Sequence, residues 1–486
     1  MSLREQAASG VRWTAVTTVA TVVLGVLQVA VLARLLDPAD FGLMTMVTTI
    51  VGFAYIWADL GLSNAVVYRQ DATRDQLSTM YWANLGAGAI VFLVAIALTP
   101  LVSAFYNEPR VRGPYLWACL GFLIIPFGQQ FQMLLQKEMR FRRMGAIEVL
   151  AGLVGLFVSV GTALHGSGVY ALVWGQLAAF SSRSALLVVT GWRLWRPGLH
   201  VAWADLRGII GFGLYQMGER SIYYVTANAD YLLIGRYLGA ADLGIYTIAY
   251  TLVVQPLLRM RTVLTRVAFP VFARRQNDPG ALRRGFCEMI ELVGVATFPL
   301  YLGLAALAPL AVPVIFGWEW TASVVLVQAM VIMGMAKTLS NPANSIFLAR
   351  GRADVSFWEN VAAAVVTIVA LRLLVMEGTL AVAWAQSAVN IVFFVVEFYL
   401  LRYVIGLGWG EYLRRLGRPL ATSVAMGVVV WATYTAVRGS FAHGLPLLLV
   451  LVAEGVAAYA LLWMTIDRSY MRRTIRLMTG RAEATK

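Results

Sequence analysis

The stretch that decides the fold is RLLDPADFGLMT at residues 34–45, which returns in related form as RYLGAADLGIYT at residues 236–247. The second copy begins 202 residues after the first, and Arg, Leu, Ala, Asp, Gly and Thr stand at matching places. Each copy joins two apolar runs of about 20 residues or more, the length of a membrane-spanning helix. A segment that recurs at a fixed offset between similar neighbours indicates two related halves of the chain.

The composition places both halves in a membrane. Of the 486 residues, 60% are hydrophobic and only 13% are charged, with a mean hydropathy of +0.72. Soluble domains average about 45–50% apolar and about 25% charged residues. Polar residues this scarce cannot cover the surface of a soluble core, which excludes a large soluble enzyme. Composition therefore predicts an all-α integral membrane protein that crosses the bilayer many times.

Apolar segments of spanning length predict fourteen transmembrane helices. The first starts near Trp13 and is too long for a signal-peptide core, so we expect a spanning helix there and not a cleaved leader. The predicted spans are about 12–34, 42–66, 80–105, 113–135, 146–165, 169–191, 208–236, 243–268, 286–309, 322–348, 356–375, 379–401, 418–437 and 445–466.

The basic residues predict the orientation of these spans. With the N-terminus in the cytoplasm, 27 Lys and Arg residues fall in cytoplasmic segments and six fall in outside segments. Cytoplasmic loops carry such an excess, so both termini are predicted inside. The net charge of +14 is therefore mostly a topology signal, and we expect no nucleic-acid partner.

The repeat predicts two lobes. Both copies of the repeated stretch fall in outside loops, so each half holds an even number of spans. We expect an N-terminal lobe at 1–200 with spans one to six, a second lobe at 201–403 with spans seven to twelve, and two additional spans with a basic cytoplasmic tail at 404–486. Parallel repeats predict a pseudo-two-fold axis along the membrane normal, with the functional site between the lobes.

Ionisable groups inside spans are the candidate functional residues, because each costs about 2.5–3.5 kcal/mol at the bilayer centre on an insertion scale. The seventh and eighth spans are richest, with Glu219, Arg220 and Asp230 in one and Arg259 and Arg261 in the other. A water-filled cavity explains this cluster, and structural ion pairs, such as Glu219 with an arginine, are the alternative. The other candidates are Asp59, Arg183, Lys337, Glu397 and Glu454.

The offset of 202 adds a hypothesis about a gate. It aligns Asp59 with Arg261, and we expect these opposite charges to pair at the inner mouth in one transport state. No catalytic set accompanies them: the three histidines are isolated in connectors, and a Walker-type phosphate loop is absent. Cys119 and Cys287 suit neither a disulfide framework nor a metal site. We therefore expect no enzyme activity, no metal and no cofactor.

Short motifs along the whole chain carry a family resemblance. They are GVRW at 10–13, LDPADFG at 36–42, DLGLS at 59–63, QKEMRF at 136–141, FPVF at 269–272 and FGWEW at 316–320. Together they resemble the polysaccharide transporter branch of the multidrug/oligosaccharidyl-lipid/polysaccharide exporter superfamily. The resemblance implies a flippase of the bacterial inner membrane that moves undecaprenyl-diphosphate-linked oligosaccharides of exopolysaccharide or lipopolysaccharide to the periplasmic leaflet by alternating access.

The resemblance also implies roles for particular residues. Cationic residues of the cavity would bind the diphosphate, and by position these are Arg12, Arg220, Arg259 and Arg261. Arginine suits the role because its planar, always-charged fork matches phosphate. Aromatic candidates for stacking on sugars are Tyr215, Tyr223, Tyr224 and Trp174. Some relatives couple transport to Na⁺ or H⁺, for which Asp230 with Asn228, or Glu219, is a candidate site. A polysaccharide polymerase or other export machinery is an expected partner.

Two other functions stay open at this point. A drug or cation antiporter of the same superfamily is expected to have an acidic cavity and twelve helices, which the arginines and the two extra spans disfavour. An integral-membrane polysaccharide-processing enzyme needs a sizeable outside loop or an embedded His/Asp/Glu set, and the sequence offers neither.

Overall fold

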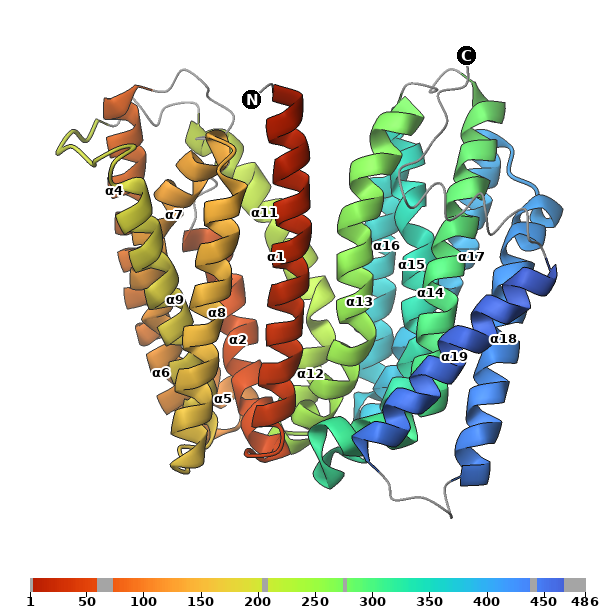
Figure 1. Cartoon of the computed structure of the whole chain (residues 1–486). Coiled ribbons are helices and arrows are strands. Elements are labelled where there is room, and N and C mark those ends of the chain that lie inside the picture. Colours follow the sequence, from red (N-terminus) through yellow and green to blue (C-terminus); the bar gives the residue numbers. More distant parts are fainter. Residues whose placement is uncertain (1–2, 59–72, 203–208, 274–277, 438–443, 467–486) are drawn as a thin grey trace. The chain divides into compact units, whose positions relative to one another are not determined.

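The computed structural model describes residues 3–58, 73–202, 209–273, 278–437 and 444–466, and all regular structure in these ranges is helical. By backbone contacts the chain divides into two compact units, Met1–Gly244 and Ile245–Lys486, which we call the first and the second unit. Within each unit the long helices run alongside one another (Figure 1). The long helix α13, Ala240–Ala273, begins in the first unit and continues into the second.

The first unit contains ten described helices before α13. They are α1 Leu3–Leu32, α2 Pro38–Ala58, α4 Arg74–Ala97, α5 Thr99–Tyr106, α6 Arg112–Cys119, α7 Gly121–Lys137, α8 Phe141–Leu164, α9 Val169–Gly191, α11 Ile209–Ala227 and α12 Ala229–Tyr237, with a 3₁₀ turn η1 at Pro109–Val111. The second unit contains α14 Pro279–Phe316, α15 Ser323–Ala349, α16 Ala353–Leu374, α17 Thr379–Ile405, α18 Trp409–Val437 and α19 Leu445–Ile466, with 3₁₀ turns η2 at Trp318–Trp320 and η3 at Val375–Glu377.

Each predicted span overlaps one described helix or a consecutive pair, and residues 59–66 of the second span lie outside the described residues. Among the described residues, eleven helical segments are long and apolar enough to cross a membrane, and α1 adds a shorter apolar stretch at Val16–Leu32. The predicted all-α architecture is confirmed. The count of fourteen spans stays a prediction, and the described helices are consistent with it. The division of the chain by its repeat, at residues 200 and 403, also stays a prediction.

Three predicted spans are broken into two helices. The span predicted at 80–105 divides into α4 and α5 at Leu98, where Pro100 stands in the first turn of α5. Proline lacks a backbone N–H and is favoured in the first turn of a helix, where that donor has no partner within the helix. The span at 113–135 divides at Leu120, and the span at 208–236 divides at Asn228, which precedes α12. Apolar length alone does not reveal these breaks.

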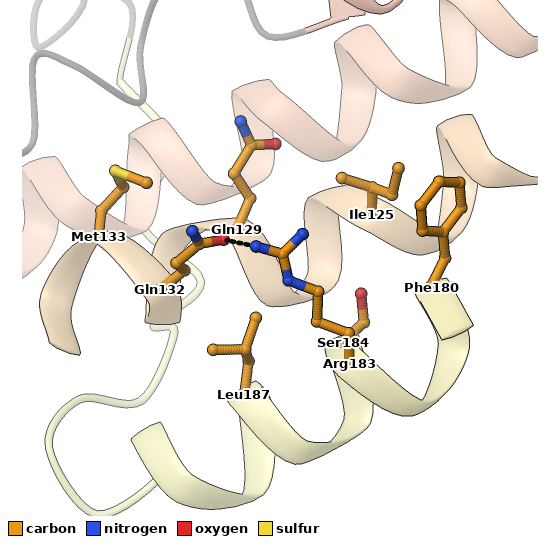
Figure 2. Close-up of a pocket in the computed structure, with 8 residues that line it drawn as sticks. All are labelled: Ile125, Gln129, Gln132, Met133, Phe180, Arg183, Ser184 and Leu187. Carbon is orange, nitrogen blue, oxygen red and sulfur yellow. Dashed lines mark hydrogen bonds between the residues drawn. The ribbon is translucent and has the colours of Figure 1, made fainter. Parts of the chain in front are cut away.

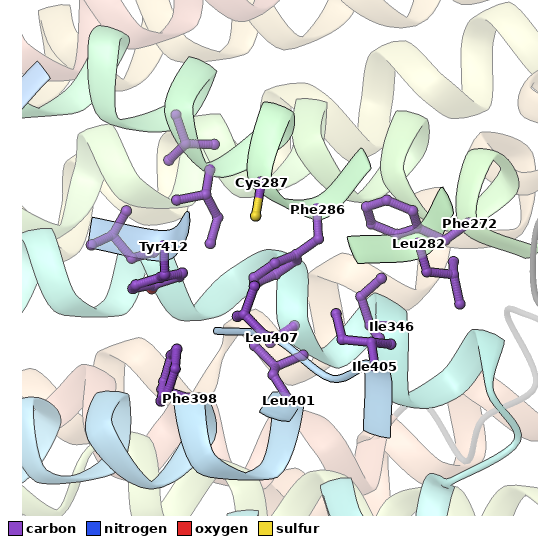
Figure 3. Close-up of a cluster of buried hydrophobic side chains, with 14 of the residues drawn as sticks. Phe272, Leu282, Phe286, Cys287, Ile346, Phe398, Leu401, Ile405, Leu407 and Tyr412 are labelled. Carbon is purple, nitrogen blue, oxygen red and sulfur yellow. The ribbon is translucent and has the colours of Figure 1, made fainter. Parts of the chain in front are cut away.

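Each unit has a hydrophobic core at corresponding helix ends. In the first unit the core joins the start of α4 and α8 to the ends of α7 and α9, with Phe131 and Leu135 fully buried. In the second unit, shown in Figure 3, it joins the start of α14 and α18 to the ends of α13, α15 and α17, with Phe286 and Phe398 among its buried rings. By the predicted topology, all these ends lie toward the cytoplasm.

The two copies of the repeated stretch touch each other inside the first unit. A methyl group added to Gly42, in α2, would overlap the carbonyl oxygen of Ala240 in α13. A methyl group added to Gly244 would overlap the carbonyl oxygen of Pro38. The offset of 202 relates Gly42 to Gly244 and Pro38 to Ala240, so the same contact is made twice with its partners exchanged. This is the pattern that two-fold symmetry produces, and small residues permit such close helix crossings in membranes.

Candidate functional site

Glu219 and Arg220 lie side by side in the middle of α11, and both are exposed. Within the described part of the chain neither forms an ion pair or a hydrogen bond. The alternative that Glu219 is a structural partner of an arginine therefore finds no support in the described residues. Because an unpaired charge in hydrocarbon is costly, these two side chains are suited to an aqueous cavity.

Asp230 occupies a different environment at the start of α12. It is 1% exposed, and its Oδ1 accepts a hydrogen bond from the backbone N–H of Tyr231 at 2.9 Å. The amide of Asn228 donates from Nδ2 to the carbonyl oxygen of Tyr224 at 2.8 Å. The buried carboxylate and the amide thus stabilise the junction between α11 and α12, and their candidacy for ion coupling remains a hypothesis.

The other predicted site residues are only partly described. Arg12 lies in α1, and Arg259 and Arg261 lie in α13, but the structure describes only the backbone at these positions. Asp59 lies outside the described residues, and so does the predicted gate between Asp59 and Arg261. The predicted site therefore stays a prediction.

A polar pocket that the sequence did not single out lies between α7 and α9 in the first unit. Its centre is Arg183, whose Nη2 donates to Gln132 Oε1 at 3.2 Å and to Glu148 Oε1 at 3.3 Å. Figure 2 shows the guanidinium projecting between Gln129, Gln132 and Ile125. Arg183 stands out in the sequence as a charge inside a span, but its partners are 35 and 51 positions away and carry no local signal.

The second unit contains two carboxylates that approach each other. Glu397 of α17 is 5% exposed, lies within electrostatic range of Glu359 of α16, and accepts a hydrogen bond from Ser340 of α15. Glu291 of α14 is buried to a similar degree but has a cation, because Arg415 Nη1 lies 2.7 Å from its Oε2. The two buried glutamates, Glu397 and Glu291, therefore have opposite electrostatic neighbours.

The aromatic candidates differ in how exposed their side chains are. Tyr224 is engaged in helix packing, since its hydroxyl donates to the carbonyl oxygen of Thr49 in α2 at 3.1 Å. Tyr223, the next residue, is 59% exposed. Trp174 packs on Trp117 with ring centroids 6.0 Å apart. The side chain of Tyr215 lies outside the description. Of the three candidates whose side chains are described, Tyr223 is the most exposed.

The two cysteines are buried, and Arg110 is paired with a neighbouring carboxylate. Cys119 and Cys287 are both free and buried, and the described residues contain no cluster of three or more His, Cys, Asp or Glu side chains that could hold a metal. In the connection after α5, Arg110 hydrogen-bonds to Glu108 at 2.8 Å. This bond lowers the pKa of the Glu108 carboxyl, so the pair stays charged and mutually neutralised near neutral pH.

The helical fold with its intramembrane charges defines a polytopic membrane transport protein, and comparisons with known proteins specify the family. The sequence profile of the polysaccharide biosynthesis protein family matches residues 31–325. The teichuronic acid biosynthesis protein TuaB of Bacillus subtilis (strain 168) is 32% identical over 466 residues, covering 95% of this chain and 96% of TuaB. The chain belongs to the polysaccharide biosynthesis protein family, as its motifs predict.

Two further similarities agree with this assignment. The lipopolysaccharide biosynthesis protein WzxC of Escherichia coli (strain K12) is 32% identical over 444 residues, covering 91% of this chain and 90% of WzxC. Among solved structures, the lipid II flippase MurJ in an inward closed conformation superposes with a TM-score of 0.76 at 11% identity, covering 94% of this chain and 99% of MurJ. An inward-facing multidrug resistance MATE transporter of the MOP superfamily reaches 0.60 at 13% identity, covering 79% and 95%. The likenesses to these two solved structures establish the fold.

Proposed function

We propose that this protein is a flippase that moves undecaprenyl-diphosphate-linked oligosaccharide repeat units from the cytoplasmic to the periplasmic leaflet by alternating access. The observation that carries this proposal is the similarity to TuaB and WzxC over at least 90% of both chains. The fold shared with a lipid II flippase is consistent with it. A drug antiporter can share the fold, but TuaB and WzxC, each 32% identical to this chain, are biosynthesis proteins of teichuronic acid and lipopolysaccharide.

The diphosphate is the group that most needs protein contacts inside the membrane. It brings at least two negative charges, and arginine forks neutralise and orient such groups. We assign this role to Arg12, Arg220, Arg259 and Arg261. Arg220 supports the assignment best, because it is exposed in a helix predicted to span the membrane and makes no ion pair with the described residues.

The depth of these arginines supports access from the cytoplasm. At about 1.5 Å per residue, Arg12 lies roughly 14 Å along α1 from Leu3, and Arg220 lies roughly 16 Å along α11 from Ile209. By the same rise of about 1.5 Å, Arg259 lies roughly 21 Å from Ala273, the end of α13. In the N-in, C-in topology inferred from the basic residues, these distances start from cytoplasmic helix ends, so we expect the cations nearer the cytoplasmic than the periplasmic end of their helices.

We also infer an inner-membrane location, a cytoplasmic N- and C-terminus, and coupling of transport to Na⁺ or H⁺ through Asp230 or Glu219. A polysaccharide polymerase is the partner expected to consume the flipped repeat unit. A reporter that is active only in the periplasm, fused after the C-terminal residue, should be inactive. A flipping rate in liposomes that responds to an imposed pH or Na⁺ gradient is the expected sign of coupling.

The main experiment removes the gene from its host and follows lipid-linked repeat units. We expect the units to accumulate on the cytoplasmic leaflet and the polymer to disappear, with both effects reversed by the wild-type gene. Liposomes that contain the purified protein and a fluorescent undecaprenyl-diphosphoryl saccharide should show protein-dependent movement between leaflets. Normal arrival of the repeat units at the periplasmic leaflet in the deletion strain, with no second copy of such a gene present, would show that the proposal is wrong.

A further inference from the structure

The pocket between α7 and α9 is a cavity of about 330 Å³ within the membrane-spanning part of the first unit. Its polar groups come from two helices: Gln129 and Gln132 from α7, Arg183 and Ser184 from α9. Phe180 lies at one end of the pocket (Figure 2). Polar side chains are expensive at membrane depth and usually mark a pathway or a partner. Four polar side chains line this one pocket, and a bound ligand would explain their presence.

The charge of the pocket limits the ligand. Arg183 is matched by Glu148 of α8, whose Oε1 lies 3.3 Å away, so the two formal charges cancel. A diphosphate or another dianion would bring its charge beside this carboxylate, and like charges repel strongly where the dielectric constant is low. The pocket is therefore suited to an uncharged polar group.

The guanidinium retains donors for such a group. Both hydrogen bonds of Arg183 use Nη2, and its Nη1 and Nε make none with the described residues. A guanidinium carries five N–H donors, and a glutamine amide offers both donors and an acceptor. A sugar hydroxyl both donates and accepts, so this set matches hydroxyls on neighbouring ring carbons. Hydrogen bonds from a charged donor are also stronger than neutral ones.

We propose that this pocket is a subsite for one uncharged sugar ring of the glycan head group, separate from the arginines assigned to the diphosphate. The proposal rests on the proposed flippase function and deepens it. The size fits a single ring, since 330 Å³ lies at the lower end of the range of about 300–1,000 Å³ for small-molecule pockets. Phe180 offers an apolar ring surface, held in place by an edge contact with Tyr55 at 6.4 Å between centroids.

The exposure of the Arg183–Glu148 pair can be compared with that of a structural ion pair in the second unit. Arg415 and Glu291 join α18 to α14 at 2.7 Å, and the Glu291 side chain is only 6% exposed. Arg183 and Glu148 are farther apart at 3.3 Å, and their side chains are 37% and 42% exposed. The open geometry of the Arg183 pair leaves both groups accessible to a ligand, whereas the Glu291 carboxylate is closed off.

The test measures binding of four lipids to the full-length protein in nanodiscs. These are undecaprenyl diphosphate without sugar and undecaprenyl diphosphate that carries glucose, galactose or N-acetylglucosamine. In the wild type we expect at least one sugar to tighten binding about tenfold, which corresponds to about 1.4 kcal/mol. In the Gln129→Leu/Gln132→Leu variant this ratio should fall to near one, while the affinity for undecaprenyl diphosphate without sugar stays within about twofold.

Matched controls separate the sugar subsite from general effects on folding. The Glu291→Gln/Arg415→Gln variant neutralises the structural ion pair and should keep the sugar-dependent ratio. If the double glutamine variant does not fold, Gln129→Leu alone should lower the ratio about threefold. An unchanged ratio in a folded glutamine variant, or equal affinities for all four lipids in the wild type, overturns the subsite alone. Failure of the wild type to bind any diphosphate lipid contradicts the flippase function itself, and the subsite with it.

Discussion

Gly42 and Gly244 face each other where α2 and α13 cross, so that a methyl group on Gly244 would lie 3.1 Å from the backbone nitrogen of Gly42. Each glycine also lies against a backbone carbonyl of the other repeat segment, Gly42 against Ala240 and Gly244 against Pro38. The two halves of the repeat therefore meet through the positions that make them recognisable in the sequence. Backbone atoms cannot rotate away as a flexible side chain can, so neither position tolerates a larger residue.

Substitution of either glycine should destabilise the protein by a similar amount. We expect Gly42→Ala and Gly244→Ala each to cost about 1–3 kcal/mol, the usual cost of overpacking, and to lower the midpoint of thermal unfolding in detergent. Gly86→Ala is the matched control, because Gly86 lies in α4 with nothing within 4 Å of an added methyl group. Alanine there improves helix propensity, so its midpoint should not fall. Unequal losses at Gly42 and Gly244 would contradict the two-fold relation.

Arg220 of α11, which makes no ion pair with the described residues, should matter for transport and not for folding. Arg220→Gln is expected to reduce the flipping rate in liposomes at least tenfold, because a diphosphate loses a charged partner, and to leave the unfolding midpoint unchanged. Arg372→Gln serves as the control, since Arg372 lies in the last turn of α16, on the side predicted to face the periplasm. Equal rates for the two variants would remove Arg220 from the diphosphate site.

The two buried glutamates of the second unit should respond to neutralisation in opposite ways. Glu397→Gln removes a carboxylate that lies near Glu359, so we expect the unfolding midpoint to rise. Glu291→Gln leaves Arg415 without its carboxylate and should lower stability by about 1–3 kcal/mol, the cost of an unsatisfied partner. Both substitutions preserve side-chain volume. A lower midpoint for Glu397→Gln would mean that the hydrogen bond from Ser340 stabilises the carboxylate by more than Glu359 destabilises it.

Neighbouring tyrosines of α11 should separate packing from recognition. Tyr224→Phe loses the 3.1 Å hydrogen bond to Thr49 and should cost about 0.5–1.5 kcal/mol of stability with little change in transport per folded molecule. Tyr223→Ala removes a ring that is 59% exposed and should weaken the binding of sugar-bearing lipids relative to undecaprenyl diphosphate. Unchanged binding in Tyr223→Ala would exclude this ring from sugar contact.

Local sequence properties were sufficient to predict the architecture. The apolar runs are local features of the chain, and each predicted span overlaps helices of the structure. The orientation inferred from Lys and Arg stays a prediction. Hydrocarbon forces backbone polar groups to pair within a helix, so hydrophobicity alone implies helical spans. The family assignment followed from short motifs in the same local way, and the matched profile confirms it.

Which charges have partners was decided only by the tertiary structure. The sequence shows that Arg183, Arg220, Glu397 and Asp230 lie inside spans, but each could face lipid, a neighbouring helix or a cavity. That choice depends on the rotation of each helix about its axis and on helices tens to hundreds of residues away. Packing placed Glu148 and Gln132 beside Arg183 and left Arg220 without a partner in the described residues. Composition and spacing thus determined that the chain is an all-α membrane protein, because hydrocarbon imposes helices, while three-dimensional packing determined which of its charges have partners among the described residues.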